Sequence, residues 1–355
     1  MITKRQIADI LNSYNTDELS IATVCSHSSL QIFDGARKEG FKTIGICIGK
    51  PPRFYDAFPK AKPDEFIVVD SYEEIVDIAP LLQEKNAIVI PHGSFVEYMG
   101  TDEFLEFEVP TFGNRAVLDW ESDRVKEREW LESAGIHMPR LVEPEDINSP
   151  VMVKYHGAKG GRGFFVAKNH EEFLANIDKS QKYTIQEFIV GTRYYLHYFY
   201  SPLKTEGYKL SKGTLEMLSM DRRVESNADE IFRLGSPREL EEAGVYPTYV
   251  VTGNVPLVAR ESLLPKIFAL GEMVVEESLS RFGGMIGPFC LETVFTDQLE
   301  IKVFEISARI VAGTNLYTNG SPYSDMIEEN LSTGRRIAQE IKLAAKLNQL
   351  ENLLS

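Results

Sequence analysis

Short apolar segments alternate with amphipathic ones along the first 90 residues. Residues 1–20 form a polar amphipathic helix, and Ser71 with Glu74 forms a capping box that opens another helix running through Leu82. Strands that alternate with helices predict an α/β domain built on a parallel sheet. The apolar segments predict strands over residues 21–25, 43–48, 66–69 and 87–90.

Polar, turn-forming residues follow two of these strands. The first strand ends in SHSS, residues 26–29, and the fourth ends in HGS, residues 92–94. Ligands of parallel sheets bind beyond the carboxyl ends of the strands. Ser28 and Ser29 also open the next helix, whose free N–H groups favour an anion. This edge of the sheet is therefore a candidate site for a phosphate group.

The hydrophobic pattern changes after residue 116. A charged amphipathic helix is predicted over 118–135, and Pro139 and Pro144 mark a linker. The compact unit that follows has strands over 151–154, 164–168 and 183–191 and a helix over 171–177. The remainder has long alternating strands over 193–202 and 299–309 and helices over 264–282 and 332–354. We therefore predict three parts, residues 1–116, 117–192 and 193–355.

Composition narrows the class of protein. The 355 residues are 43% hydrophobic, enough for more than one folding unit, and the formal charge of -15 argues against coating nucleic acid or an anionic membrane. Cys25, Cys47 and Cys290 form no C-x-x-C pair, so we expect buried thiols rather than a disulfide framework or a zinc site. Because the chain has no apolar run of about 18 residues and no signal-peptide segment, we expect a cytoplasmic protein.

A glycine-rich segment follows the strand that ends in Lys154. Its four glycines leave backbone N–H groups free to wrap an anion, and Lys154 is placed to reach a nucleotide phosphate. No GK[ST] opens a helix, so the segment is a strand-to-strand hairpin rather than a Walker A loop. The alternative is a flexible surface turn. The candidate ATP-binding residues here are Lys154, Gly157, Ala158, Lys159, Gly160, Gly161, Arg162 and Gly163.

Two carboxylates lie inside apolar segments, where a lone carboxylate is costly to bury. Glu292 lies in GPFCLETVF and Glu305 in VFEISAR, and the short turn TDQLE brings the two strands side by side. Carboxylate pairs of this kind hold magnesium against nucleotide phosphates. Arg309, four residues beyond the second carboxylate, is then placed to contact a phosphate oxygen. The alternative is that one carboxylate pairs with Arg309 for structural reasons.

The segment QEFIVG ends a short strand on glycine. Its backbone groups are candidates to line an adenine slot. On its own the segment is typical of a core strand, and it gains weight only because it follows the lysine and the glycine-rich hairpin. The candidate residues are Gln186, Glu187, Phe188 and Ile189.

Together these residues resemble the ATP-grasp superfamily, which implies an ATP-grasp fold. The order along the chain is a strand lysine, a glycine-rich hairpin, an EFI-type hinge, two late carboxylates and an arginine. Many members carry Asn two residues after the last carboxylate, where this sequence has Ser307. A hydroxyl at this position holds metal or phosphate more weakly than an amide.

Across nearly the whole chain the resemblance narrows to the archaeal formate–phosphoribosylaminoimidazolecarboxamide ligases, the FAICAR synthetase or PurP family. It implies an N-terminal preATP-grasp domain with a parallel sheet and assembly into trimers or hexamers. It implies ATP, formate and 5-aminoimidazole-4-carboxamide ribonucleotide (AICAR) as substrates, with magnesium or manganese as the metal. The segments that carry it include IATVCSHSSLQIFDGARKEGF, IVIPHGSFVEYMG, FGNRAVLDWESDR, MDRRVESNAD, TGNVPLVARESLLP and FEISARIVAGTN.

The resemblance also implies roles for single residues. His27, Ser94 and Asn254 match substrate contacts of the family, and Glu225 matches an ATP contact. Glu292 and Glu305 match the magnesium positions of the family. Some relatives have Gln at the first of these positions. The alternatives are that His27 caps a helix and that Asn254 fills a turn.

The implied reaction passes the γ-phosphoryl group of ATP to formate, with metal and Lys154 or Arg309 neutralising the charge. The 5-amino group of AICAR then attacks the resulting formyl phosphate and expels phosphate, under a lid for which the glycine hairpin is the candidate. Two alternatives stay open. The chain is a ligase for another acid and amine, or it is a non-catalytic nucleotide-binding regulator. Intact Lys154, Glu292, Glu305 and Arg309 argue against the regulator.

Overall fold

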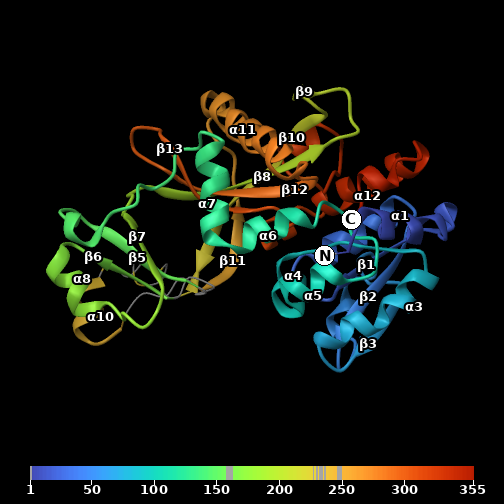
Figure 1. Ribbon diagram of the computed structural model, residues 1–355, viewed down its shortest axis with the longest axis horizontal. Helices are drawn as coiled ribbons and strands as arrows, with labels where there is room; N and C mark the ends of the chain where they lie inside the picture. Colours follow the sequence, from blue (N-terminus) through green and yellow to red (C-terminus); the bar gives the residue numbers. More distant parts are fainter. Residues whose placement is uncertain are drawn as a thin grey trace.

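The protein is built on three sheets with a mixed α/β architecture (Figure 1). In Figure 1 a four-stranded sheet lies at one end, a small three-stranded sheet lies at the other, and a six-stranded sheet lies between them. The computed structural model describes residues 2–156, 163–226, 228, 231, 235, 237–245 and 250–355.

The N-terminal sheet is parallel, as predicted, with the strand order β3-β2-β1-β4. All residues of β1 are buried, because this strand lies between two others and helices pack on the sheet. The strands are β1 (Ser20–Val24), β2 (Lys42–Ile48), β3 (Glu65–Val69) and β4 (Ala87–Val89). The helices of this region include α1 (Lys4–Asn12), α2 (Ser29–Lys38), α4 (Gly93–Met99) and α5 (Thr101–Glu106).

The region between β3 and β4 differs from the single capped helix that we predicted. It forms a 3-10 helix over Glu73–Ile78 and then α3 (Ala79–Glu84). Pro80 has no N–H to donate, so an α-helix cannot continue through it, whereas its place in the first turn of α3 leaves no donor unsatisfied. The predicted capping box does not form, because the Glu74 carboxylate accepts the backbone N–H of Asp70 instead.

The charged helix predicted over 118–135 is two helices, α6 (Ala116–Ser122) and α7 (Arg124–Ser133). Asp123 lies between them with an extended backbone, and its carboxylate accepts two backbone N–H groups of α7. An aspartate in this position caps the second helix, so the chain turns there. The α7 helix packs on α11 (Leu264–Phe282), whose bounds match the prediction.

A small antiparallel sheet in the order β6-β5-β7 follows the proline-containing linker. One helix covers it and places Phe173 in a separate apolar core. The pairing of Lys154 with Phe164 confirms the strand-to-strand hairpin. These elements, called the small lobe below, are β5 (Val151–Tyr155), β6 (Phe164–Ala167), α8 (His170–Asn176) and β7 (Tyr183–Glu187).

The central sheet has the order β11-β10-β8-β12-β13, with β9 paired to β10. The α11 helix covers one face of it, where the Tyr198 hydroxyl of β8 donates to the Ile267 carbonyl. Gly271 of α11 lies so close to this face that an added Cβ would be 2.8 Å from the Leu215 side chain. The strands are β8 (Thr192–Ser201), β9 (Tyr208–Lys209), β10 (Thr214–Glu225), β11 (Val251–Pro256), β12 (Gly287–Phe295) and β13 (Ile301–Ser307).

The last long helix, α12 (Thr333–Lys346), joins the central sheet to the N-terminal domain by packing on α2. It ends earlier than predicted, and a 3-10 helix over Leu350–Asn352 follows it. The two helices touch through glycines. A Cβ added to Gly35 would lie 2.1 Å from the backbone nitrogen of Arg335, and one added to Gly334 would lie 2.2 Å from the carbonyl oxygen of Gln31.

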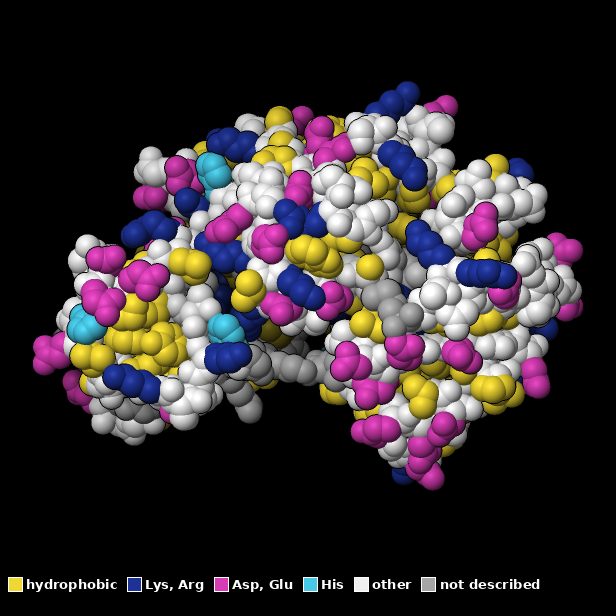
Figure 2. All heavy atoms as spheres, in the orientation of Figure 1, with side chains coloured by type: hydrophobic (Ala, Val, Ile, Leu, Met, Phe, Trp, Pro, Cys, Tyr) yellow, Lys and Arg dark blue, Asp and Glu magenta, His cyan; other side chains and the backbone are white. Residues whose placement is uncertain are grey.

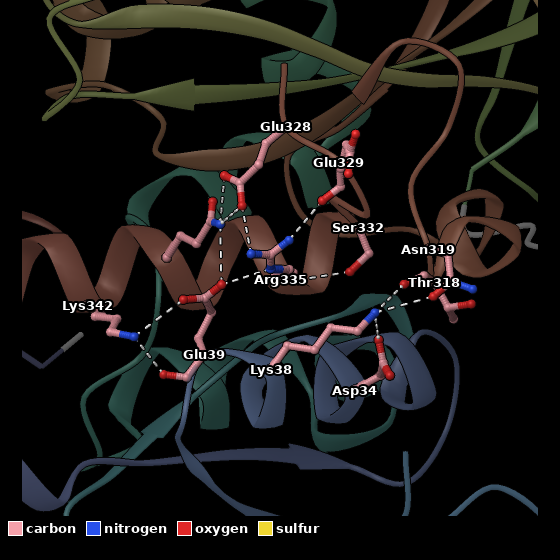
Figure 3. Close-up of polar contacts among 11 residues, drawn as sticks. Asp34, Lys38, Glu39, Thr318, Asn319, Glu328, Glu329, Ser332, Arg335 and Lys342 are labelled. Atoms are coloured by element: carbon pink, nitrogen blue, oxygen red, sulfur yellow. Dashed lines mark hydrogen bonds and ion pairs between the residues drawn. The ribbon is translucent and has the colours of Figure 1, made fainter. Parts of the chain in front are cut away.

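Ion pairs surround this glycine contact (Figure 3). Arg335 pairs with Glu39 of α2 at 2.8 Å and with Glu328 at 2.6 Å, and Lys342 reaches Glu39 at 3.4 Å. Glu328 and Lys342 are exposed, and pairs with exposed side chains contribute only about 0–1 kcal/mol each, whereas Arg335 and Glu39 are largely buried. The close backbone contact and the buried apolar residues around it therefore fix the two domains together, and the ion pairs add specificity.

The remaining elements are short. No helix in the described ranges is long and apolar enough to cross a membrane. The cysteines are free thiols, with Cys47 and Cys290 buried and Cys25 half-buried, in agreement with the expectation of unpaired thiols. The short helices are α10 (Pro237–Glu242) and 3-10 helices over Thr16–Glu18, Arg53–Ala57, Pro144–Asp146, Glu261–Leu263, Ala312–Tyr317 and Ser324–Met326.

Candidate functional site

A row of polar side chains crosses the face of the central sheet that points away from α11. Asp221 on β10 pairs with Tyr195 on β8, which pairs in turn with Glu292 on β12. Glu292 also pairs directly with Glu305 on β13, which confirms the predicted neighbouring carboxylates. Cross-strand partners point to the same face of a sheet. Tyr198 contacts α11 and is an odd number of residues from Tyr195, so the row lies on the opposite face.

Glu292 is held by an arginine that the sequence analysis did not identify. Nη2 of Arg223 lies 2.9 Å from Oε1 of Glu292, and Nη1 lies 3.4 Å from Oε2. The guanidinium stacks on the Tyr195 ring, with Cζ 3.7 Å from the ring centroid. Burial alone would lower the pKa of Arg223, but Glu292, with smaller contributions from Tyr195, Cys290 and Asp221, raises it, and the net result is a pKa above the ordinary value. The arginine therefore stays charged.

Glu305 lies opposite without such a clamp. Burial, and then the charge of Glu292, raises the pKa of Glu305 to about 7. The positive charges of Lys154 and Arg124 act in the other direction. Lys154 is the residue before the last of β5 in the small lobe and lies over the Phe304 ring, with Nζ 5.4 Å from its centroid, and burial lowers its pKa. The lysine of the small lobe and the carboxylates of the central sheet thus form one cluster.

Two further buried glutamates line this cluster, and both lie on the charged helices before the linker. Glu127 accepts the backbone N–H of Ile306 at 2.7 Å, and Glu121 accepts that of Ala308 at 2.9 Å. Burial raises the pKa of both carboxyl groups. A sequence signal existed for Glu127, which is three residues before the buried Trp130 and so lies on the apolar stripe of its helix.

The donor set fits the predicted metal in part. Glu292 and Glu305 offer side-by-side carboxylate oxygens, the ligands that Mg²⁺ prefers, and Mg²⁺ fills its other positions with water and substrate phosphates. Among the described residues no group of three or more His, Cys, Asp or Glu side chains is placed to hold a metal ion. The pair therefore suits a metal that arrives with a nucleotide rather than an all-protein cage.

Arg309 links this cluster to the N-terminal domain. Its guanidinium pairs with Glu121 at 2.7 Å, rather than with either metal-site carboxylate as the structural alternative proposed. A Cβ added to Gly93 would lie 2.9 Å from Nη1 of Arg309, and the next residue, Ile310, forms a bridge with His92. Arg309 therefore stands between the carboxylates and the HGS segment after β4.

The HGS segment and the SHSS segment form a polar corner at the carboxyl ends of β1 and β4, which are neighbours in the sheet. Ser94 and Ser28 are buried, and neither Oγ atom has a hydrogen-bond partner within the described part of the chain. Ser28 has a left-handed backbone (φ 69°) and stands at the start of α2 without capping it through its side chain. His27 beside it is exposed and does not fill the N-cap position of α2.

The buried side chain of His92 stabilises this corner. Its ring is fully buried, with Nε2 3.0 Å from the Val24 carbonyl and Nδ1 accepting the Phe95 N–H at 3.3 Å. Burial, with a smaller contribution from the charge of Arg309, lowers the pKa of His92 to about 4. The ring is therefore neutral and ties the ends of β1 and β4 together.

Asn254 lies at the other end of the central sheet, on the edge strand β11. Its Nδ2 donates to Oδ2 of Asp221 at 2.7 Å, and Oδ1 of Asp221 contacts His197 Nε2 at 2.5 Å. Gly313 lies against this group, since an added Cβ would be 2.5 Å from Asp221. One N–H of the Asn254 amide is thus engaged by protein, and the amide oxygen and the second N–H remain for a ligand.

The structure describes only some of the predicted nucleotide contacts. Gly163 has a left-handed backbone (φ 69°), and its carbonyl accepts the Tyr155 N–H at 2.9 Å. Glu225, at the end of β10, pairs with Arg193 at 2.8 Å. The other candidates in the glycine-rich hairpin lie outside the described residues, namely Gly157, Ala158, Lys159, Gly160, Gly161 and Arg162.

The QEFIVG segment connects the small lobe to the central sheet. Gln186 and Glu187 end β7, and the Glu187 carboxylate accepts the backbone N–H of Arg140 at 3.0 Å. Phe188 is 39% exposed, whereas Ile189 is half-buried, so the strand does not continue into a core at this point. The segment joins the two sheets, and its roles as a hinge and at an adenine slot stay predictions.

The surface view is hollowed between the small lobe and the rest of the molecule (Figure 2). Lysine and arginine side chains gather on the side of the central body next to this hollow, whereas acidic side chains dominate the visible face of the N-terminal domain. The chain is acidic overall, so this is a local basic surface, as an anionic nucleotide would require.

Comparison with known proteins matches the chain over nearly its whole length. Residues 166–355 match a family described as a domain of unknown function (DUF1297), and residues 21–142 match one described as a protein of unknown function (DUF1246). The 5-formaminoimidazole-4-carboxamide-1-(beta)-D-ribofuranosyl 5'-monophosphate synthetase of Methanococcoides burtonii is 79% identical, with all of both chains covered.

Solved structures agree with this match. The crystal structure of an IMP biosynthesis protein PurP from Thermococcus kodakaraensis superposes with a TM-score of 0.72 at 32% identity, covering 94% of this chain and 100% of that one. N5-carboxyaminoimidazole synthetase from Staphylococcus aureus, complexed with ADP, has a TM-score of 0.62 at 14% identity, covering 91% of this chain and 76% of that one. The second likeness shows the fold alone, which is the ATP-grasp fold that the sequence predicted.

The depressed pKa of His92 predicts a pH-dependent stability. Because the folded-state pKa of about 4 lies below the ordinary value of 6.5, the unfolded chain binds more protons between these values. The stability from a neutral His92 is thus present above pH 6.5 and is lost as the pH falls through 4. Relative to His92→Gln, the parent should lose about 3 kcal/mol of unfolding free energy between pH 7 and 4.

Urea denaturation at several pH values measures this difference. His137→Gln, a change at an exposed histidine, is the control and should follow the parent curve. Parallel curves for the parent and His92→Gln would show that His92 takes up its proton without opening the corner.

Proposed function

Because this chain belongs to the family of 5-formaminoimidazole-4-carboxamide ribonucleotide synthetases, we propose that it is a carbon–nitrogen ligase that formylates AICAR with ATP and formate. The products are FAICAR, ADP and phosphate, and the step belongs to purine (IMP) biosynthesis. One observation carries the proposal. Lys154, Glu292 and Glu305 come from two separate sheets and meet in one buried cluster, with Arg309 between that cluster and the polar corner of the N-terminal domain.

The cluster suits transfer of the γ-phosphoryl group. Magnesium or manganese bound by Glu292 and Glu305 would neutralise phosphate charge and hold the phosphates in line. Lys154 lies beside Glu305 and places its ammonium group at the same position from the small lobe. Arg309 supplies a fixed guanidinium, oriented by Glu121, for an oxygen of the transferring group. Formate, a poor electrophile, would thereby become formyl phosphate, which the 5-amino group of AICAR attacks with loss of phosphate.

The polar corner suits the 5′-phosphate of AICAR. The α2 helix begins at this corner, and the free N–H groups of a helix start favour an anion. Among the described residues the buried hydroxyls of Ser28 and Ser94 have no protein partner to lose when they bind an oxygen. His27 is exposed beside them. Asn254 has its amide nitrogen fixed by Asp221 and offers its oxygen as an acceptor for a donor group of the substrate. These roles are proposals for this chain.

ATP would lie between the small lobe and the central sheet, with the glycine-rich hairpin as its lid. Glu225 and the hinge residues from Gln186 to Ile189 are the proposed contacts to the nucleoside. A part in purine synthesis would place the enzyme in the cytoplasm, and we propose a homotrimer or homohexamer. A ligase for another acid and amine would use the same cluster, so the substrates have to be tested directly.

The proposed reaction requires that ATP cleavage be coupled to the formylation of AICAR. With Mg²⁺, ATP, formate and AICAR, the protein should release ADP, phosphate and FAICAR in equal amounts, measured by chromatography. Because formyl phosphate forms productively only in the closed complex, omission of formate or AICAR should suppress ADP release. ADP release at the full rate without AICAR or formate would contradict the assignment.

We expect Ser94→Ala to weaken AICAR binding without lowering the melting temperature. Loss of a hydrogen bond to a charged phosphate costs about 1.5–3 kcal/mol, so the KM for AICAR should rise about 10- to 100-fold while the KM for ATP stays unchanged. The Ser94 hydroxyl is buried without a partner, so its removal should leave the melting temperature equal or higher.

Ser71→Ala is the matched control, since Ser71 follows β3 at the edge of the same sheet. Ser71→Ala should change neither the KM for AICAR nor the melting temperature. A lower melting temperature with an unchanged KM for AICAR in Ser94→Ala would mean that the hydroxyl only supports the fold. His27→Ala provides a second measurement of the same site, and it too should raise the KM for AICAR alone.

A further inference from the structure

The two metal-site carboxylates are neutralised unequally. Glu292 and Glu305 are direct cross-strand partners, an arrangement in which like charges repel. Arg223 holds Glu292 through a fork of two contacts, at 2.9 and 3.4 Å. Among the described residues the Glu305 side chain makes no hydrogen bond or ion pair, and the charges of Lys154, Arg124 and, less strongly, Arg223 compensate it.

The arginine is built into its position. Its guanidinium stacks on the Tyr195 ring, and only 20% of its side chain is exposed, against 8% for the Glu292 side chain. A planar fork of this kind occupies both oxygens of a carboxylate. The guanidinium takes the lone pairs that face it, and its positive charge repels a cation, so a metal ion has to compete with Arg223 for Glu292. Arg223 is also the direct cross-strand partner of Asn254 on β11, so it lies between the carboxylates and the proposed substrate contact.

We propose that Arg223 is an exchangeable counter-ion that occupies the metal position of Glu292 until the nucleotide binds. The inference rests on the proposed function in one respect, the use of Glu292 and Glu305 as metal ligands. Free metal has to displace a guanidinium that would be left half-buried without an anion, so it binds weakly. A metal–nucleotide complex brings phosphate oxygens that take the released guanidinium, and the exchange then conserves every charge pair.

The exchange gives Arg223 a second role after the metal has bound. In the nucleotide-free protein it cancels the repulsion between the two carboxylates. With nucleotide present it becomes a donor to phosphate from the side of β10, opposite Lys154 on the small lobe. The metal site is thereby closed to free cations and opened by the substrate itself.

Direct binding of Mn²⁺ tests this proposal without catalysis. Paramagnetic resonance of free Mn²⁺ is titrated with the nucleotide-free protein, in the absence of formate and AICAR. Arg223→Gln removes the competing cation and leaves two facing carboxylates, so it should bind Mn²⁺ at least about tenfold more tightly than the parent. Arg222→Gln is the matched control, because Arg222 is the exposed neighbour on the same strand, and it should bind like the parent.

The double variant Arg223→Gln with Glu305→Gln locates the gained site. It should lose the gain, because the added Mn²⁺ affinity depends on the carboxylate pair. Adding ADP should raise the Mn²⁺ affinity of the parent much more than that of Arg223→Gln. An Arg223→Gln protein that binds free Mn²⁺ no more tightly than the parent overturns the proposal, and so does a double variant that keeps the gain.

Arg223→Lys decides the matter if the glutamine variant does not fold. Lysine keeps the charge but loses the second contact and the planar stack on Tyr195, so Mn²⁺ affinity should rise by a smaller factor in the same direction. A folded lysine variant with parent affinity overturns the proposal. Failure of the formylation reaction would leave all these binding results intact, so the proposed function and this inference fail separately.

Discussion

Two buried glutamates that face each other across β12 and β13 are the constraint on which the rest of the site depends. Glu292 and Glu305 would repel one another in a low-dielectric environment, and the fold compensates with cations from different parts of the chain. Arg223 comes from β10, which β8 separates from β12, and Lys154 comes from the small lobe. Because two buried carboxylates are unstable without nearby cations, each positive side chain has to lie close to the pair. A nucleotide phosphate requires the same positive charges.

The supporting structure follows from this constraint. The α6 and α7 helices carry Glu121 and Glu127 to the backbone N–H groups at the end of β13, and this fixes the strand that bears Glu305. Glu121 in turn orients Arg309 toward the HGS segment of the N-terminal domain. The close packing of α12 on α2 holds that domain against the central sheet. The polar corner of the N-terminal domain and the carboxylate cluster of the central sheet are therefore held in place by buried contacts.

The sequence predicted the features that depend on residues close together in the chain. Alternation and turn signals located the parallel sheet and the paired carboxylates, and the hairpin after Lys154 followed from its glycines. Pro80 and Asp123 divided two predicted helices, because a missing N–H and a capping carboxylate act over a few residues. Arg223 could not be found from the sequence, because its partner is 69 residues away and only strand register joins them.

The central claim is that the carboxylate pair is costly to the empty protein and necessary to the working one. Glu305→Gln tests both halves, by thermal denaturation at pH 8 without nucleotide and by turnover at saturating Mg²⁺ and ATP. The account predicts a melting temperature that is equal or higher, because a like charge is removed, and turnover reduced at least about 100-fold, since loss of an outer-shell partner alone costs about 10- to 100-fold. A lower melting temperature together with turnover near that of the parent would contradict it.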